Sequence, residues 1–177
     1  WRGLDGSIAK LPVGVGSPFE IPHPPNPTGG AITTGDDADV WVFTCSRNNT
    51  GEAWLNHWDG GAWRTTNVSR VLPGRNIRQG TMTRHPDGRL LLAVSAVSTD
   101  DVADLPTWWG HPSLQCFLLA SEDAGRTFTA HPLSPGNSDR ACWFPNIMRD
   151  APNHDLRQPF VLYTEGPPGE GCLAPDR

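Results

Sequence analysis

Prolines and glycines recur along the whole chain, and they constrain its fold more than any other feature of the sequence. They number 18 and 19 among 177 residues and are interleaved with tryptophans and β-branched residues. A proline inside a helix removes a backbone hydrogen bond and clashes with the preceding turn, so long helices are hard to form. The spacing has neither the period of collagen nor the low complexity of a linker. Many short strands joined by frequent turns fit this pattern, and the sequence predicts an all-β fold.

The apolar segments and turns follow a repeating order of four strands from Ala31 onward. A turn at Asp59-Gly60-Gly61 joins the last two strands of the first unit, because glycine tolerates the positive φ that tight turns need. We expect the strands of this unit at 31–34, 40–45, 53–58 and 63–68. The second unit is expected at 80–84, 89–97, 114–120 and 127–131, with a long loop at 98–112. A third unit begins with strands at 142–148 and 159–163.

Four-stranded antiparallel sheets repeated along a chain are typical of a β-propeller, whose blades pack radially around a channel. We interpret residues 1–177 as part of one such domain, with blades at about 31–68 and 76–131 and a partial blade at about 140–177. About two and a half blades form an incomplete ring with open edges. We therefore expect the remainder of the propeller to be a missing segment of a longer polypeptide, a nicked partner chain or identical copies. The start at Trp1 rather than Met likewise predicts a processed product or a fragment.

The charge pattern argues against several classes of partner. The formal net charge is −5, and Lys10 is the only lysine among 14 cationic residues, so there is no basic stripe for a nucleic acid. No apolar run approaches the roughly 18 residues that would span a bilayer. No nucleotide-binding loop is present, and we expect no cofactor.

The four cysteines, Cys45, Cys116, Cys142 and Cys172, lack the close spacing of a zinc site, so we expect no metal. Their even number permits two disulfides in one of three pairings, and four buried or free thiols are the alternative. Glycosylation sequons at Asn48 and Asn67 are compatible with secretion, which predicts a secreted or cell-surface protein.

One short motif has an evident local mechanism. Ser121 to Phe128 reads Ser-Glu-Asp-Ala-Gly-Arg-Thr-Phe. The Asp123 carboxylate can accept backbone N–H bonds within its own turn, as short acidic side chains do. Gly125 permits a left-handed backbone. A shortened version of the motif, Trp58-Asp59-Gly60-Gly61-Ala62-Trp63, stands at the same place in the preceding unit.

The motif matches the Asp-box pattern at every defined position: Ser121, Asp123, Gly125, Thr127 and Phe128. In this respect the chain, over about Phe19 to Glu165, resembles the sialidase-like (BNR-repeat) superfamily of β-propellers. The superfamily includes sialidases, other glycosidases, some polysaccharide lyases and non-catalytic proteins, so the resemblance implies a fold and leaves the function open. It also implies that the Asp box is structural and lies opposite the active-site face.

The resemblance does not extend to the residues with which sialidases bind and cleave their substrate. A sialidase holds the substrate carboxylate with three arginines, because a planar guanidinium pairs with it in bidentate fashion. It also uses a Tyr nucleophile activated by a Glu, with an Asp as acid/base. In Phe19-Glu20-Ile21-Pro22, a glutamate stands where the family motif has the first arginine, and it would repel a carboxylate. Arg47 resembles the arginine that follows the second strand in family members. We therefore expect a relative with another substrate rather than an exo-sialidase.

The topology of a blade places candidate site residues on one face, at the loops between second and third strands and at the links between blades. The substrate-binding candidates are Arg47, Arg78, Arg140, Trp108, Trp109 and Trp143. The catalytic candidates are Tyr163, Glu165 and His111. Tyr163 and Glu165 lie two apart, so a regular strand places them on one face as a nucleophile and its base. His111 is the proton-transfer group that a lyase would use.

Each of these candidates has a structural alternative. The two tryptophans of the long loop could cover the base of that loop. Arg78 and Arg140, placed just before first strands, could make inter-blade salt bridges or cap strands, and Glu165 could be a loop residue. Arginines, acids and aromatics at a channel mouth suit a glycan. We therefore predict a carbohydrate-active propeller, a glycoside hydrolase of sialidase-like type with a glycan substrate. The alternatives are a polysaccharide lyase acting on uronates and a non-catalytic glycan- or protein-binding propeller.

Overall fold

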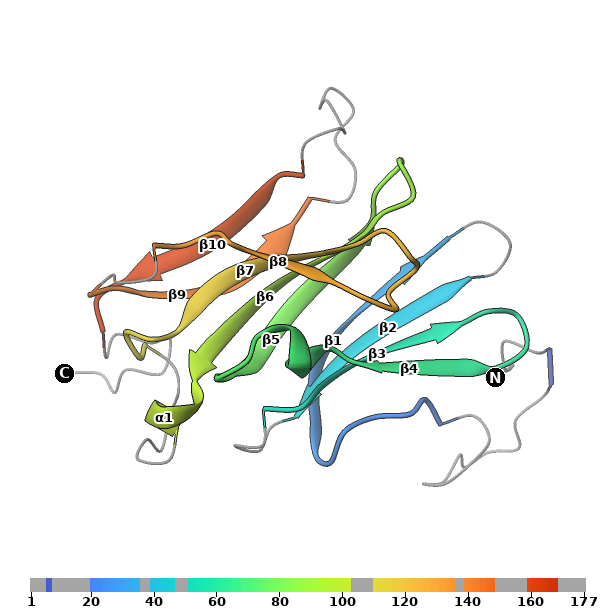
Figure 1. The fold of residues 1–177 in the computed structure, drawn as a ribbon, viewed down its shortest axis with the longest axis horizontal. Coiled ribbons are helices and arrows are strands. Elements are labelled where there is room, and N and C mark those ends of the chain that lie inside the picture. The colour runs from blue at the N-terminus through green and yellow to red at the C-terminus, as the bar shows by residue number, and fades with distance from the viewer. Residues whose placement is uncertain are drawn as a thin grey trace.

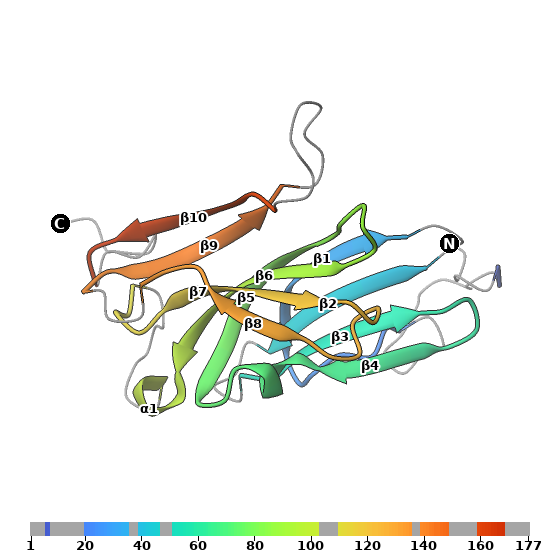
Figure 2. The same ribbon diagram turned by 45° about the horizontal axis from the view of Figure 1, so that its top comes forward.

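A computed structural model of the protein describes residues 6–7, 20–35, 39–46, 51–102, 110–135, 139–148 and 159–168. Its regular structure is almost entirely antiparallel β-sheet, arranged as three sheets side by side with the second sheet between the other two (Figures 1 and 2). The all-β prediction is confirmed, and the three antiparallel sheets pack one against the next in chain order.

The first two sheets each have four strands in sequential order, and the described part of the third has two. The first sheet contains β1 (Pro27–Thr34), β2 (Val40–Ser46), β3 (Ala53–Trp58) and β4 (Trp63–Asn67), followed by the 3-10 turn η1 (Val68–Val71). The second contains β5 (Arg75–Arg84), β6 (Leu90–Ser98), β7 (Gln115–Ser121) and β8 (Thr129–Pro132), with the short helix α1 (Thr99–Val102) after β6. The third contains β9 (Ala141–Ile147) and β10 (Val161–Gly166).

Every predicted strand is present, but two first strands begin earlier than predicted. β1 begins at Pro27 rather than Ala31, and β5 begins at Arg75 rather than Gly80. The added stretches are polar or glycine-rich and carry no apolar alternation. They are strands because they pair with the second strand of their own sheet, as Arg75 does with Ser98.

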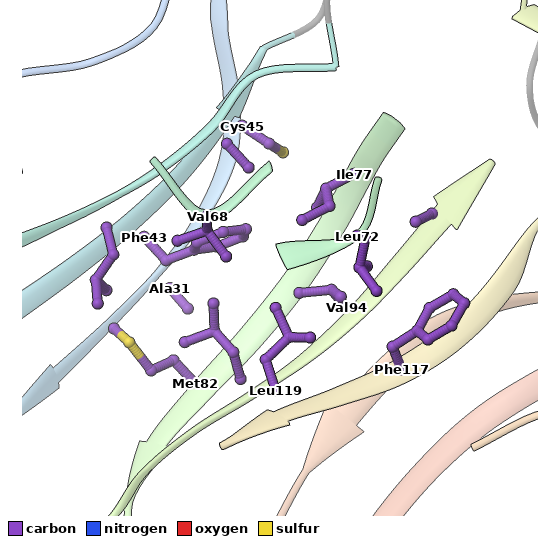
Figure 3. Packing of buried hydrophobic residues seen from close by; sticks show 14 of the residues in the cluster. Ala31, Phe43, Cys45, Val68, Leu72, Ile77, Met82, Val94, Phe117 and Leu119 are labelled. Atoms are coloured by element: carbon purple, nitrogen blue, oxygen red, sulfur yellow. The ribbon is translucent and has the colours of Figure 1, made fainter. Parts of the chain in front are cut away.

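The sheets are held together by apolar side chains on the faces that meet. Between the first and second sheets, Phe43 packs with Met82 and Leu119 in one buried cluster (Figure 3). Leu55 belongs to the same cluster. Each such fully buried side chain stabilises the fold by roughly 1.5–3 kcal/mol. A smaller cluster around Ile147 joins the second and third sheets. β6 is buried on both faces because it lies in the middle of this stack.

The first strands of the three sheets form the inner edge of the assembly. β1 packs against β5, and β5 packs against β9. Each of them carries an irregularity in its pairing: between Thr28 and Gly30, between Ile77 and Gln79, and in β9 at the two residues opposite Tyr163. A β-bulge bends a strand and re-aims the side chain at the extra position. Each of the three first strands therefore has one irregular position in its pairing.

The three cysteines in the described part of the chain are buried free thiols. The sequence left open whether the cysteines form disulfides or are free thiols. Cys45, Cys116 and Cys142 are free thiols, while Cys172 lies outside the described residues. Among the described residues, no helix is long and apolar enough to cross a membrane.

Candidate functional site

The two ends of the strands carry different chemistry. At one end lie the turns that join first to second and third to fourth strands. At the other end lie α1, η1 and the links between sheets (Figure 1). The first end holds the motif at Ser121–Phe128, and the second holds the catalytic candidates that the structure describes.

Asp123 organises the turn of its motif. One carboxylate oxygen accepts the backbone N–H groups of Arg126 at 3.0 Å and Thr127 at 2.9 Å, and the other accepts the Thr127 hydroxyl at 2.7 Å. The Ser121 hydroxyl donates to Asp123 at 2.8 Å. Partial burial by itself raises the pKa of Asp123, but these hydrogen bonds together outweigh it and lower the pKa to about 2.

The same turn docks on the neighbouring sheet. The carbonyl of Ala124 accepts from the Trp41 indole at 3.2 Å and from Arg64 at 3.0 Å. Gly125 has φ +83°, and a Cβ there would overlap the side chain of Leu55. These contacts give the turn a role in holding blades together.

The shortened motif is built in the same way. Asp59 Oδ1 accepts the N–H groups of Gly61 at 3.2 Å and Ala62 at 3.1 Å, and these bonds lower the pKa of the carboxyl. Trp58 and Trp63 pack edge to face across the hairpin, with ring centroids 5.5 Å apart. The turn is thus closed by backbone hydrogen bonds and an aromatic pair.

At the opposite end, Tyr163 and Glu165 each have a partner of their own. Glu165 forms an ion pair with Arg140, with Nε 2.9 Å from Oε1, and both side chains are exposed. The Tyr163 hydroxyl donates to the carbonyl of Leu133 at 3.4 Å. Burial, with smaller contributions from nearby thiols and Glu165, raises the pKa of Tyr163. A phenol with a raised pKa is a hydrogen-bond donor at neutral pH, whereas a nucleophilic tyrosine needs activation by a base.

His111 is held by Ser113. Its Nδ1 accepts the Ser113 backbone N–H at 3.2 Å and lies 2.7 Å from the Ser113 hydroxyl. Asp101 of α1 is 3.8 Å from the same nitrogen. Because Nδ1 accepts, the ring proton lies on Nε2, and that nitrogen donates. This arrangement differs from a serine–histidine–aspartate triad, in which the acid and the hydroxyl bond to opposite ring nitrogens.

Arg75 braces this end of the second sheet. It donates to the carbonyl of Ser113 and to the side chain of Gln115, each at 3.0 Å, and its guanidinium lies 5.0 Å from the ring centroid of Phe117. Burial lowers the pKa of Arg75, and the charge of Asp101 opposes the shift. Arg75 therefore positions the segment that carries His111.

Arg78 lies inside β5, at its bulge, and not before the strand as the sequence predicted. The reason is the earlier start of β5. Arg78 is only 2% exposed, and its carbonyl accepts from the Cys45 thiol at 3.1 Å. Burial lowers the pKa of its guanidinium. This inter-blade position fits the structural alternative for Arg78 better than direct contact with a substrate.

Trp143 is also in a packing position. It is 5% exposed in a cluster with Val97, Leu114 and Ala141, and its ring lies against the backbone of Gly166. The ring has no open face for the sugar stacking that the sequence suggested. Arg140 directly precedes β9, as predicted. Arg47, Trp108 and Trp109 lie outside the described residues.

Sequence reasoning missed Phe144. This residue lies in the bulge of β9, is 44% exposed and has φ +51°. The signal for it was Pro145, because a proline inside a strand marks an edge or a bulge. Among the described residues, no group of three or more His, Cys, Asp or Glu side chains is arranged to hold a metal ion.

No protein-family model matches the chain, and its sequence matches no curated protein. Its fold is similar to that of a Penicillium chrysogenum α-L-arabinanase, solved in complex with arabinobiose, with a TM-score of 0.52 and 18% sequence identity. The match covers 81% of this chain and 48% of the arabinanase, so the chain spans about half the length of that protein. At this identity the likeness shows the fold, a β-propeller.

Proposed function

We propose that this chain is part of a carbohydrate-active β-propeller and acts as a glycoside hydrolase of the sialidase-like type. The observation that carries the proposal is the fold shared with an arabinanase that was solved with a disaccharide. The turn built around Asp123, which bonds to its own backbone and docks on the preceding sheet, supports kinship with Asp-box propellers. The secreted or cell-surface location expected from the sequons fits an enzyme that meets glycans.

Glu165 is our candidate for the acid/base carboxylate. Glycoside hydrolysis needs a carboxylic acid within reach of the glycosidic oxygen. Glu165 lies at the end of the sheets opposite the Asp box, is exposed and is oriented by Arg140 at 2.9 Å. Tyr163, on the same strand, has a raised pKa and donates its proton to the carbonyl of Leu133, so its oxygen would accept a hydrogen bond from a sugar hydroxyl. Nε2 of His111 would be a second donor at this end.

The test is an activity panel with matched variants. The chain is incubated with α-1,5-arabino-oligosaccharides, sialyllactose and polygalacturonate, and the release of reducing ends is measured. We expect hydrolysis of a substrate without a carboxylate, and a loss of at least about 100-fold in rate for Glu165→Gln, the usual effect of removing an acid/base group. Glu122→Gln, an exposed position in the turn at the other end, is the control and should keep full activity.

Two results would contradict the proposed reaction class, and a third would contradict only the carboxylate assignment. Ultraviolet absorbance from unsaturated uronate would show a lyase, and binding without turnover would show a non-catalytic propeller. Turnover that is unaffected by Glu165→Gln would remove the carboxylate assignment and leave the reaction class in place.

A further inference from the structure

A proline-rich segment before β1, residues 20–26, covers part of the outer face of the first sheet, the face turned away from the second sheet. We call this segment the strap. It passes along the first sheet and turns into β1 at Asn26 (Figure 1). The φ of Asn26, +48°, lies in the left-handed region that asparagine tolerates. Pro24, within the strap, is buried.

Two buried side chains of the first sheet anchor the strap by its carbonyl groups. Asn56 of β3 donates from Nδ2 to the carbonyl of Pro22 at 2.5 Å, and the Ser46 hydroxyl at the end of β2 donates to that of Pro25 at 2.8 Å. Both anchors are 0% exposed. Leu55, next to Asn56, lies in the cluster shared with the second sheet, so Asn56 projects from the opposite face. This polar side chain is buried there because the strap covers it.

His23 lies between the two anchored carbonyls, and both of its ring nitrogens face acceptors. Nδ1 lies 2.9 Å from the carbonyl oxygen of Pro24, and Nε2 lies 2.8 Å from Oε1 of Glu20. A carbonyl and a carboxylate can only accept, so each ring nitrogen needs a proton to make its bond. A neutral imidazole carries one such proton and an imidazolium carries two. Both bonds are therefore made only when His23 is charged.

The surroundings of the ring favour this charged form. The bond to the Pro24 carbonyl, and then the bond to Glu20, raise the pKa of His23 above 6.5, while desolvation opposes the shift. Among the described residues, Glu20 is the one charged group that contributes to this shift. The first sheet presents neutral anchors to the strap, the Asn56 amide and the Ser46 hydroxyl.

The sign of the pH dependence follows from the raised pKa. The folded strap binds the His23 proton more tightly than a free chain does, so the two bonds stabilise the strap fully below pH 6.5. Their contribution is lost as the pH rises through the raised pKa of the folded state. Pro22 directly precedes His23 and Pro25 follows two residues later, so a change at the ring acts next to both anchored carbonyls.

We propose that the strap is pH-sensitive: a charged His23 holds residues 20–26 against the outer face of the first sheet, and loss of its proton loosens them. In a closed propeller each face of a sheet meets another sheet, so the state of the strap sets how open this face is. The inference goes beyond the proposed function and uses none of its catalytic groups.

The experiment is an NMR titration of the full chain from about pH 5 to pH 9 that follows the His23 ring protons and the side-chain amide of Asn56. We expect His23 to titrate above pH 6.5. Across that titration the Asn56 amide, corrected for the intrinsic pH dependence of exchange, should lose about two- to fivefold of its protection, the effect of one exposed charged pair. Glu20→Gln keeps an acceptor oxygen without the charge, so His23 should titrate at a lower pH in this variant. His23→Gln should show the lower Asn56 protection at both ends of the range.

Two controls separate the strap from the rest of the fold. His131→Gln changes an exposed histidine of β8 and should follow the wild type at every pH. The backbone amides of β6 report the core and should stay protected throughout. A loss of protection that includes β6 would show general unfolding and overturn the inference.

Three other results would also overturn it. The first is titration of His23 at or below pH 6.5. The second is Asn56 protection that stays constant across the His23 titration, and the third is wild-type protection of Asn56 in His23→Gln. The proposed function is tested separately by hydrolysis in Glu165→Gln, so it stands or fails independently of the strap.

Discussion

Removal of the Asp123 carboxylate tests whether the Asp-box turn stabilises the propeller. Asp123→Ala loses three accepted bonds, from the N–H groups of Arg126 and Thr127 and from the Thr127 hydroxyl, and one from Ser121. A net contribution of about 0.5–1 kcal/mol for each of these four bonds in a half-exposed turn gives a loss of about 2–4 kcal/mol. We expect this loss in urea unfolding followed by tryptophan fluorescence, with the midpoint lowered and the slope unchanged.

The matched control for this prediction is Glu122→Ala in the same turn, an exposed residue that should change the free energy of unfolding by less than about 0.5 kcal/mol. Asp123→Asn keeps one acceptor oxygen and should fall between the two. The reasoning fails if Asp123→Ala costs no more than Glu122→Ala. It also fails if the slope changes, because the mutation would then act on the unfolded chain.

The same carboxyl makes a prediction about pH. The pKa of Asp123 is lowered to about 2 from its ordinary value near 4, so the folded state binds its proton less readily than the unfolded state does. Its contribution to stability is therefore complete above about pH 4 and is lost as the pH falls toward 2. In the wild type, the free energy of unfolding should fall more steeply over this range than in Asp123→Ala, and parallel curves would refute the assignment.

Two further predictions concern other buried parts of the fold. Gly125→Ala should destabilise the protein by about 2–4 kcal/mol in thermal unfolding, because the backbone at this position is left-handed and the new Cβ would overlap Leu55. A stability equal to that of the wild type would contradict this packing. Burial raises the pKa of Cys45 to about 11 and that of Cys116 to about 12, so neither thiol should react with a thiol reagent at pH 8 until denaturant is added. Mass spectrometry of the labelled peptides maps the reaction, and rapid labelling of the native protein would refute the burial of these thiols.

The strands were predictable wherever their signal is local. β6 is a continuous apolar run because it is buried on both faces, and the turn at Asp59 contains the glycines that its backbone needs. The early start of β5 was not predictable, because Arg75 belongs to the strand only through its pairing with Ser98. Local pattern identifies elements, whereas cross-strand register decides where they end.

The site was less predictable for the same reason. The burial of Arg78 and Trp143 depends on how neighbouring sheets meet, which no single segment encodes. The ion pair joins Glu165 of β10 to Arg140, which directly precedes β9, and the register of these two strands is shifted by a bulge. The position of Phe144 follows from that bulge and was signalled only by the proline after it.

At the Asp-box end of the blades, Trp41, His57 and Arg64 interact with other groups of the protein. Trp41 stacks on His57 with ring centroids 4.5 Å apart and an interplanar angle of 1°. Nδ1 of His57 accepts from Arg64 at 2.8 Å, and its Nε2 lies 3.2 Å from Asp39. Arg64 also donates to the carbonyl of Ala124 in the next sheet. A histidine that is stacked and bonded at both ring nitrogens has no group left for a substrate.

The opposite end of the sheets has charged groups that reach solvent, as a binding site requires. Its charged pair, Arg140 and Glu165, is exposed. Arg75, which positions the segment that carries His111, is bonded to the Ser113 backbone and the Gln115 side chain. A site needs reactive groups that reach solvent and supporting groups that hold them in place. The α1 end provides this division. The hydrolase activity that we propose is therefore tested first at this end, with Glu165 as the first position to change.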